Sequence, residues 1–500
     1  MFQPAWCWRC CTCFSILVCV MSMGKRSVLR QLFDSAPGRL GLSLLVGLTL
    51  TSLYVVFTYP LDFGPSRWSN PAVWSDNPSA APPRWTNWFS REPGPVHQVT
   101  ETREPTVVGP LGPGESRVFE LPFNHDSNLA PTFLSLTLGE INYFARPPQY
   151  WVTLIRPDGL RIPLAREVVS GPRLGESGPF IRYAETPKRL LLTSGRDVVP
   201  IIVDSLYSVY ESAGEASFRD EIKSRPLRGL FGAPNSDGTI DPLTGRYVLE
   251  VRFTLADSGD VVSSVRGVAG GAAFGLFGTD TLGRDLAEGL LFGLPIALLI
   301  GVLASTLSTL IGTTLGLVSG FVGGRTDLVI QRVADVMNNV PALPLLIFLV
   351  FILGSQLWLI LAILVVFSWP GLTILVRSMV LPLRNSPEVE AARTLGASTA
   401  HILRHHVFPH TAPFVLAQLI FFAPGAILAE AGLSFLGLGD PSLPTWGQIL
   451  EQGFRTGAVF LGYWWWIVPP GLLIVLTAVT FMLLALGMET VVNPRLREQQ

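Results

Sequence analysis

Long stretches without charge alternate with polar segments along this chain. The uncharged runs cover residues 40–59, 289–324, 336–376, 411–429 and 458–488. About 20 apolar residues are enough for a helix to cross the hydrocarbon core of a membrane. The run 336–376 is too long for one helix and contains a turn signal, Gly354-Ser355-Gln356, so we divide it into two spans. The pattern predicts six transmembrane helices.

Arginine is distributed unevenly between the segments that join these spans. With the N-terminus in the cytoplasm, the inner loops are 323–335, 377–410 and the tail after Glu489, which carry Arg325, Arg332, Arg377, Arg384, Arg393, Arg404, Arg495 and Arg497. The short outer segments 354–356 and 431–457 carry only Arg455. Cationic side chains favour cytoplasmic loops. The distribution therefore supports cytoplasmic N- and C-termini.

The segment between the first and second spans has the pattern of β-structure. Residues 247–255 alternate apolar and polar side chains, which is typical of a half-buried strand. Residues 149–155 and 160–164 flank Arg156-Pro-Asp-Gly159, a turn signal that predicts a hairpin. Further strands are expected at 118–123, 133–138 and 198–203, after an extended linker at 65–89. We expect a β-sandwich outside the cytoplasm.

These patterns divide the chain into five parts. They are a cytoplasmic N-terminal segment (1–39), a first transmembrane helix (40–60), an extracytoplasmic linker and β-rich domain (61–278), a five-helix core (279–490) with an inner loop at 377–410, and a cytoplasmic tail (491–500). The predicted fold class is an all-α polytopic membrane protein with six transmembrane helices and an inserted β-rich domain, placed in the cell (inner) membrane.

The composition is typical of a membrane protein and argues against a nucleic-acid-binding function. Charged residues make up 15% of the chain, against about 25% in soluble proteins. The formal net charge of −1 gives no footprint for nucleic acid. All cysteines lie near the N-terminus (Cys7, Cys10, Cys11, Cys13 and Cys19). Their C-x-x-C spacings occur without a second pair or partner histidines, so we expect no metal site. Met21 or Met23 is an alternative translation start.

The loop between the fourth and fifth spans carries the most informative motif. It reads Glu388-Val-Glu390-Ala391-Ala392-Arg393-Thr394-Leu395-Gly396-Ala397-Ser398, followed by Ile402 and Pro409. The pattern predicts a short amphipathic helix, a glycine break and a second helical piece. Gly396 permits a turn or a close backbone approach that a side chain would block.

This loop resembles the EAA loop of the permeases of ATP-binding-cassette (ABC) importers. In that family the loop forms a coupling helix that sits in a cleft of an ATPase subunit. The resemblance assigns coupling to the matching residues of this chain: Glu390, Ala391, Ala392, Gly396, Ala397, Ile402 and Pro409.

Two outer segments resemble the dipeptide, oligopeptide and nickel subgroup of these permeases. One is Phe277-Gly-Thr-Asp280-Thr-Leu-Gly283-Arg284-Asp285, and the other is Ile427-Leu-Ala-Glu430-Ala-Gly-Leu-Ser-Phe-Leu-Gly-Leu-Gly439, with Pro444-Thr-Trp446-Gly447 after it. The resemblance covers about 277–494. Typical members have a much shorter segment in place of the β-rich domain, so no role for that domain carries over.

Several polar residues in these segments have two interpretations. Asp280, Gly283, Arg284, Asp285 and Glu430 are candidates for gating or for lining the path. Alternatively, Asp280 caps a short interfacial helix, the charges are solvated, and Glu430 meets water at the outer interface. His401 and His405 have a metal-ligand spacing, but a basic cytoplasmic loop explains them better, and we expect no metal.

The sequence also lacks motifs for chemistry of its own. It contains no G-x-x-x-x-G-K-[ST] and no H-E-x-x-H, so we expect neither a phosphate-binding P-loop nor a zinc protease site. The chain is predicted not to be an enzyme and to bind no cofactor, with ATP bound by partner subunits.

The resemblance implies an assembly that works by alternating access. Its parts are two ATPase subunits, a second permease subunit, an extracytoplasmic solute-binding protein and the lipid bilayer. Peptide is the expected solute, while nickel, an oligosaccharide or an antibiotic peptide stays open. The alternatives are a membrane-anchored receptor or sensor that binds ligand through its β domain, and a secondary transporter, which would be expected to show inverted repeats.

Overall fold

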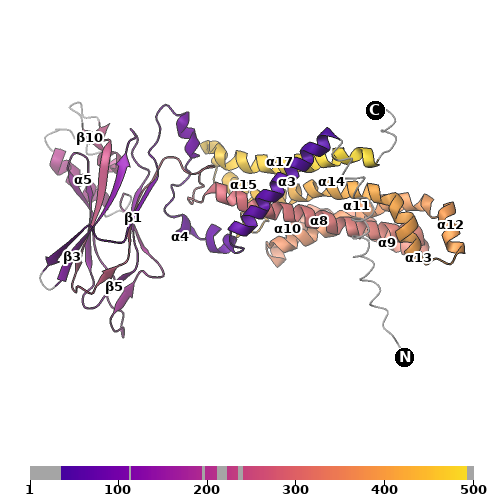
Figure 1. The fold of residues 1–500 in the computed structure, drawn as a ribbon, viewed down its shortest axis with the longest axis horizontal. Helices are drawn as coiled ribbons and strands as arrows, with labels where there is room; N and C mark the ends of the chain where they lie inside the picture. Colours follow the sequence, from indigo (N-terminus) through magenta and orange to yellow (C-terminus); the bar gives the residue numbers. More distant parts are fainter. Residues whose placement is uncertain (1–34, 112–113, 194–197, 211–221, 235–239, 493–500) are drawn as a thin grey trace. The chain divides into compact units, whose positions relative to one another are not determined.

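The computed structural model describes residues 35–111, 114–193, 198–210, 222–234 and 240–492. These separate into two compact units (Figure 1). Within the described residues, the helical unit comprises 35–70 and 288–492, and the β-rich unit lies between 71 and 287. The predictions for the N-terminal cysteines and for the terminal segments 1–34 and 493–500 lie outside the described residues.

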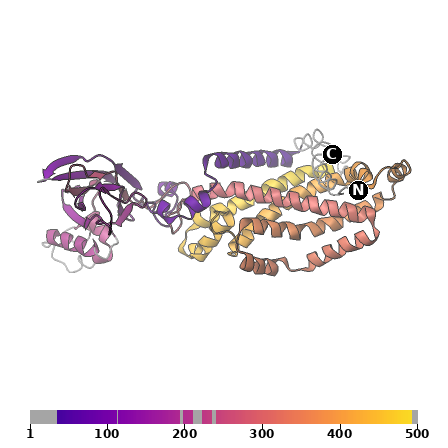
Figure 2. The same ribbon diagram turned by 90° about the horizontal axis from the view of Figure 1, so that it is seen from below.

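Five helices of the described chain are long and apolar enough to cross a membrane. They are α3 (Ala36–Thr58), α8 (Leu286–Val322), α11 (Leu357–Leu383), α14 (Phe408–Phe435) and α17 (Trp464–Val492). Figures 1 and 2 show those of the helical unit side by side in one bundle. A further pair, α9 (Gly324–Asn339) and α10 (Ala342–Leu353), meets the same criteria jointly but is bent by 85°. The chain is thus a polytopic membrane protein with five such helices, or six if the bent pair is one span.

Glycine allows α8 and α11 to approach closely. A Cβ on Gly312 would lie 2.9 Å from the carbonyl oxygen of Trp369, and one on Gly316 would lie 2.7 Å from Cβ of Val376. One turn further on, a Cβ on Gly320 would meet Val380 at 2.8 Å. Small residues at such spacing let helix backbones pack together in membranes.

The β-rich unit contains antiparallel sheets that share a core. One sheet has the order β2 (Val107–Leu111), β3 (Gly114–His125), β12 (Gly245–Leu255), β6 (Gln149–Ile155) and β7 (Arg161–Val168). Another has the order β1 (Gln98–Thr102), β14 (Val265–Ala269), β4 (Leu134–Leu138) and β9 (Lys188–Leu191). Buried side chains of both, such as Leu121, Leu136 and Val251, belong to one hydrophobic cluster. The β-rich character predicted for this region is confirmed.

Smaller elements complete this unit. A three-stranded sheet has the order β13 (Val261–Val262), β5 (Ile141–Tyr143) and β8 (Phe180–Arg182), and β10 (Gly232–Pro234) pairs with β11 (Ile240–Pro242). Two helices, α5 (Val198–Tyr210) and α7 (Pro226–Leu230), add Ile202, Leu206 and Leu230 to the shared core.

Three predictions about local structure were wrong. Residues 198–203 begin helix α5, because Ile202 and Leu206 bury the same helical face four residues apart. The linker 65–89 is not extended: it contains η1 (Gly64–Trp68), α4 (Pro71–Trp74) and η2 (Arg84–Trp88). The last span does not begin at residue 458, because Gly462, at φ +75°, separates α16 (Ala458–Leu461) from α17.

Candidate functional site

The loop between α11 and α14 is built from short helices. It consists of α12 (Pro387–Thr394), α13 (Thr399–Ile402) and η4 (Leu403–Val407), which leads into α14. Pro387 occupies the first position of α12, where its missing N–H removes no helical bond. The Ser398 hydroxyl accepts a hydrogen bond from the N–H of His401 at 3.3 Å and caps α13. Figure 1 shows α12 and α13 together at one end of the helical unit.

Gly396 ends α12 by its backbone conformation. Its φ is +82°, in the left-handed region that side chains disfavour. The N–H groups of Gly396 and Ala397 donate to the carbonyls of Arg393 and Ala392, each at 3.0 Å, which is the Schellman arrangement of a helix C-terminus. Among the residues that the structure describes, none outside the immediate neighbours lies within 4 Å of a Cβ added at Gly396. Within the described chain the positive φ, and not a close approach, requires glycine.

The loop has an anchored face and an exposed face. Val389, Ala392 and Ile402 are buried in one cluster with side chains of α8, α11 and α14, among them Phe321, Val376 and Val415. Glu390 and Ala391 are exposed, whereas Ala397 and Pro409 are half-buried. The predicted coupling residues therefore lie in one loop. Some of them lie on its buried face and others on its exposed face.

Leu395 is a candidate that the sequence analysis did not single out. Its apolar side chain is 87% exposed at the end of α12, beside the exposed Thr394 and Gly396. An isolated exposed leucine needs no explanation in general. The sequence signal that could have identified Leu395 was its position between the polar helix α12 and Gly396, the glycine that follows the end of that helix.

A polar network at the base of this loop was also missed. Nε and Nη2 of Arg377, in α11, donate to the two carboxylate oxygens of Asp327, in α9, at 2.6 Å each. The Ser319 hydroxyl, in α8, donates to the same carboxylate at 2.5 Å, and Gln331 donates to Ser319 at 2.9 Å. Three helices are joined at one point. From the sequence, Arg377 was predicted only as one of the charges of a cytoplasmic loop.

Asp280 and Arg284 form a buried ion pair before α8. Nε of Arg284 donates to the Asp280 carboxylate, and the backbone N–H groups of Leu282 and Arg284 donate to its other oxygen at 2.9 Å each. Burial raises the pKa of the Asp280 carboxyl, and the adjacent Arg284 guanidinium opposes that shift. Asp285 accepts from the N–H of Ala287 at 2.8 Å at the start of α8.

This motif ties two distant chain segments together. The Thr279 hydroxyl donates to the carbonyl of Pro78 at 2.7 Å, and the N–H of Ala80 donates to the carbonyl of Asp280 at 2.7 Å. The Asn77 amide donates to the carbonyl of Gly283 at 2.9 Å. Residues 77–81 and 279–283 thus form a clasp within the β-rich unit. These bonds favour the structural interpretation of the motif, and a gating role stays a prediction.

Glu430 belongs to another buried network, in the helical unit. Its carboxylate accepts from the Ser434 hydroxyl at 2.7 Å within α14, and the Thr445 hydroxyl lies 3.5 Å from that of Ser434. Thr445 caps the amphipathic helix α15 (Trp446–Arg455). A Cβ on Gly447 would lie 2.5 Å from the carbonyl oxygen of Ala431. The network therefore seats the start of α15 against α14.

Two histidines of the loop stack against each other. The rings of His401 and His405 stack with centroids 4.2 Å apart, and Nδ1 of His405 lies 3.1 Å from the carbonyl oxygen of His401. Among the residues that the structure describes, no group of three or more His, Cys, Asp or Glu could hold a metal ion.

The bundle of apolar helices defines a polytopic membrane protein, and its loop between α11 and α14 has one buried face and one exposed face. The protein family described as binding-protein-dependent transport system inner membrane component matches residues 312–498. The dipeptide transport system permease protein of Bacillus subtilis (strain 168) is 37% identical over 222 residues, which cover 44% of this chain and 69% of that protein. This chain belongs to the family of binding-protein-dependent transport inner membrane components.

Two further similarities extend the comparison. The oligopeptide transport system permease protein of Bacillus subtilis (strain 168) is 37% identical over 223 residues, covering 44% of this chain and 72% of that protein. A solved structure of the methionine ABC transporter MetNI, in an inward-facing conformation, aligns with 41% of this chain and 94% of its own chain at 19% identity. Its TM-score of 0.32 is too low to establish a shared fold. The family match lies wholly outside the β-rich unit.

Proposed function

We propose that this chain is the permease subunit of an ABC importer that takes up peptides. The observation that carries the proposal is the two-faced loop between α11 and α14. Its inner face is buried against three long helices, while its outer face is exposed. The named relatives are dipeptide and oligopeptide permeases, which supports a peptide as the solute.

The exposed face of α12 is the proposed contact for an ATPase subunit. Glu390, Ala391 and Leu395 face away from the rest of the chain, and Leu395 offers an apolar group to a cleft in the partner. The partner binds ATP, and this chain contributes no nucleotide site. Movement of α12 would pass through Val389 and Ala392 to the ends of α8, α11 and α14, since these side chains share one cluster.

The network around Asp327 would make the ends of α8, α9 and α11 move together, so that the movement of α12 is passed on to the spans. It joins α8, α9 and α11 through charge-assisted hydrogen bonds, which hold their geometry better than neutral ones. A second permease subunit would complete the path. The seat of α15 on Glu430 and Ser434 would form part of the outer end of this half of the path.

The remaining parts of the assembly follow from the family. A solute-binding protein would deliver peptide on the outer side, and the β-rich unit, proposed to be a β-sandwich, would lie on that side too. The N- and C-termini would then be cytoplasmic. A cysteine at the exposed Asn128, in a variant without the five native cysteines, should react with an impermeant thiol reagent in intact spheroplasts. Labelling only after lysis would reverse the orientation.

Co-purification and uptake test the function as a whole. The chain is expressed with the ATPases, second permease and binding protein of its own transport system, and uptake of a labelled dipeptide into proteoliposomes is followed. We expect uptake that requires ATP and the binding protein. Leu395→Asn should reduce ATPase co-purification, whereas Leu395→Met, which keeps an apolar side chain, should not. Absence of any ATPase from the wild-type complex would favour the receptor alternative.

A further inference from the structure

A cavity lies between η2 and the end of β3 in the β-rich unit. Arg84, Asn87 and Trp88 of η2 line it, and so do His125, the last residue of β3, and Asp126, which follows it. Its volume is about 310 Å³, within the range of about 300–1,000 Å³ that is typical of small-molecule sites. All of its lining residues belong to the β-rich unit.

A second cavity, of about 170 Å³, shares residues with the first. Arg84, Asn87 and Val96 line both cavities, whereas His97 and Phe274 line only the second. No acidic side chain is among the residues that line the second cavity. The two cavities together are named here the Arg84 cavity.

Hydrogen bonds fix the position of η2 beside this cavity. The backbone N–H of Arg84 donates to the carbonyl of Gly275 at 3.0 Å, and the Asn87 amide donates to the carbonyl of Gly94 at 3.3 Å. The Arg84 guanidinium itself forms no hydrogen bond or ion pair with any residue that the structure describes. A positioned backbone thus carries a cationic group that is free to bind a ligand.

His97 provides a second donor. Its Nδ1 accepts from the N–H of Gly271 at 3.4 Å, so the proton of the neutral ring is on Nε2. Burial lowers the pKa of His97, although the carboxylate of Asp76 opposes the shift, and the ring is therefore neutral at pH 7. Within the described residues, Nε2 has no partner to which it donates.

His125 is a buried polar group that also lacks a partner. Its side chain is 2% exposed, and among the described residues nothing forms a hydrogen bond with its Nε2. Burial lowers the pKa of this ring too. A buried nitrogen without a hydrogen bond costs free energy, and His125 lines the larger cavity. A polar ligand in that cavity would remove this cost.

The charges of the lining residues indicate the class of ligand. The Arg84 guanidinium and the Nε2–H of His97 are suited to a carboxylate. Asp126 is the acidic residue that lines the larger cavity, and in the described chain it forms no ion pair, so it is available to an ammonium group. Trp88, which is 83% exposed, and Phe123 add aromatic surface.

We propose that the Arg84 cavity binds a short peptide with free termini, its carboxylate at Arg84 and His97 and its ammonium group at Asp126. His97 and Asp126 line different cavities, so the ligand has its two charges farther apart than a single amino acid does. The inference goes beyond the proposed function, because the family match does not cover this unit and the ligand class follows from the lining residues themselves.

Calorimetric titration of the purified full-length chain in nanodiscs tests the site. The probe is the dipeptide alanyl-phenylalanine. Arg84→Gln should weaken its Kd about 10- to 100-fold, the loss expected when hydrogen bonds to a charged group are removed. Folding should be unchanged, because the Arg84 side chain is exposed and unpaired. Arg103→Gln is the matched control: Arg103 is also exposed but lines neither cavity, and this variant should keep the wild-type Kd.

Blocked peptides test each end of the ligand separately. Alanyl-phenylalanine amide lacks the carboxylate and should bind wild type and Arg84→Gln equally weakly. N-acetyl-alanyl-phenylalanine lacks the ammonium group, so Asp126→Asn should weaken binding of the free dipeptide and leave binding of the acetylated one unchanged. Free phenylalanine should bind more weakly than the dipeptide.

Several results would overturn the site. They are the absence of dipeptide binding, equal binding of the dipeptide and its amide, tighter binding of free phenylalanine, and a wild-type Kd for Arg84→Gln. The titration needs neither an ATPase nor a solute-binding protein. ATP-dependent peptide uptake without binding at the Arg84 cavity would therefore leave the proposed function standing, and binding without uptake would leave the site standing.

Discussion

Arg377 of α11 holds Asp327 of α9 through two hydrogen bonds of 2.6 Å each. The residues are 50 positions apart in the chain, and Ser319 adds the end of α8 to the same carboxylate. The pair lies where the helices meet the loop that carries α12, so it links the proposed ATPase contact to the spans.

Breaking this pair should weaken coupling more than folding. We expect Arg377→Ala and Asp327→Ala each to reduce uptake by roughly 2- to 30-fold, corresponding to about 0.5–2 kcal/mol. The double variant should be no worse than either single one, because both remove the same interaction. Uptake is measured in proteoliposomes at matched protein level. Arg332→Ala, at an exposed site on the same helix, is the control, and strictly additive effects would contradict the proposed link.

Substitutions at Gly396 should be tolerated in the order in which the new residue can adopt the left-handed backbone conformation. Its φ of +82° makes Gly396→Val unfavourable by about 1–2 kcal/mol, whereas Gly396→Asn should be milder because asparagine enters that region more readily. Membrane levels should stay normal for both, and uptake should fall mainly for valine. Glu390→Ala, at an exposed helix start, should change stability by only about 0.3–1 kcal/mol. Normal uptake by Gly396→Val would show that the Schellman turn is dispensable.

Glu430 distinguishes a structural from a path-lining role. Its carboxylate accepts from Ser434 in the network that seats α15. Glu430→Gln retains an acceptor oxygen and should keep most uptake, whereas Glu430→Leu leaves the Ser434 hydroxyl without this partner and should lower both membrane level and uptake. Uptake kinetics and quantitative immunoblots measure the two effects. Loss of uptake by Glu430→Gln at normal membrane level would instead indicate that the carboxylate acts on the solute.

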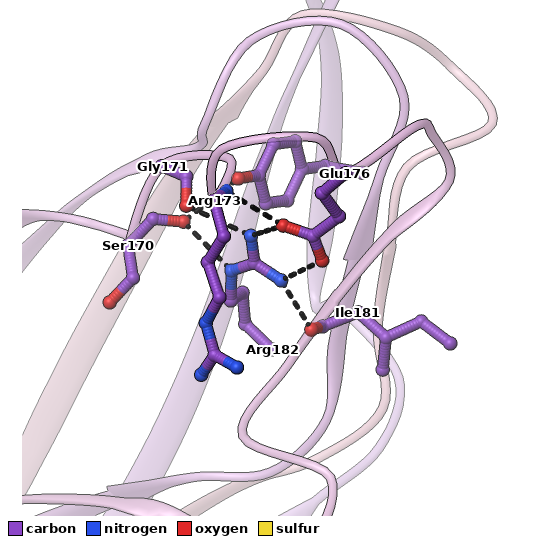
Figure 3. Close-up of polar contacts among 7 residues, drawn as sticks. Ser170, Gly171, Arg173, Glu176, Ile181 and Arg182 are labelled. Atoms are coloured by element: carbon purple, nitrogen blue, oxygen red, sulfur yellow. Dashed lines mark hydrogen bonds and ion pairs between the residues drawn. The ribbon is translucent and has the colours of Figure 1, made fainter.

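The loop around Leu174 should loosen in acid, because Glu176 binds Arg182 there. Nη2 and Nη1 of Arg182 donate to the two carboxylate oxygens of Glu176 at 2.6 and 2.8 Å (Figure 3). The folded-state pKa of Glu176 is lowered to about 2 from its usual 4.5, so its contribution is fully present above pH 4.5 and is lost as the pH falls toward 2. A spin label at Leu174→Cys should become more mobile across that interval in electron paramagnetic resonance spectra. Glu176→Gln should be mobile already at neutral pH and insensitive to acid. An immobile label in Glu176→Gln would mean that other bonds order the loop.

The sequence predicted elements whose pattern is local. Strand β6 was predicted at its observed bounds, because alternation and a proline–glycine turn mark it directly. The five long helices were predicted from uncharged length. The family was recognised from short motifs whose residues are contiguous, and the comparisons confirm it.

The failures arose where distant residues decide the structure. The β-branched residues of 198–203 favour a strand locally, but packing of Ile202 and Leu206 on the core makes them helical. The bend of 85° between α9 and α10 could not be predicted from hydropathy, because hydropathy gives the apolar length of a segment and not the direction in which its helix runs. The Asp327–Arg377 pair joins residues with no periodic relation, and Leu174 lies in a loop whose order comes from Arg182, outside the turn itself.

The clasp between residues 77–81 and 279–283 has a consequence for how such a chain arises. Because residues 77–81 and 279–283, near the two ends of the β-rich unit, are hydrogen-bonded to each other, the unit begins and ends at nearly the same point. A gene segment that encodes a module with adjacent ends can be inserted or removed without rerouting the helices on either side.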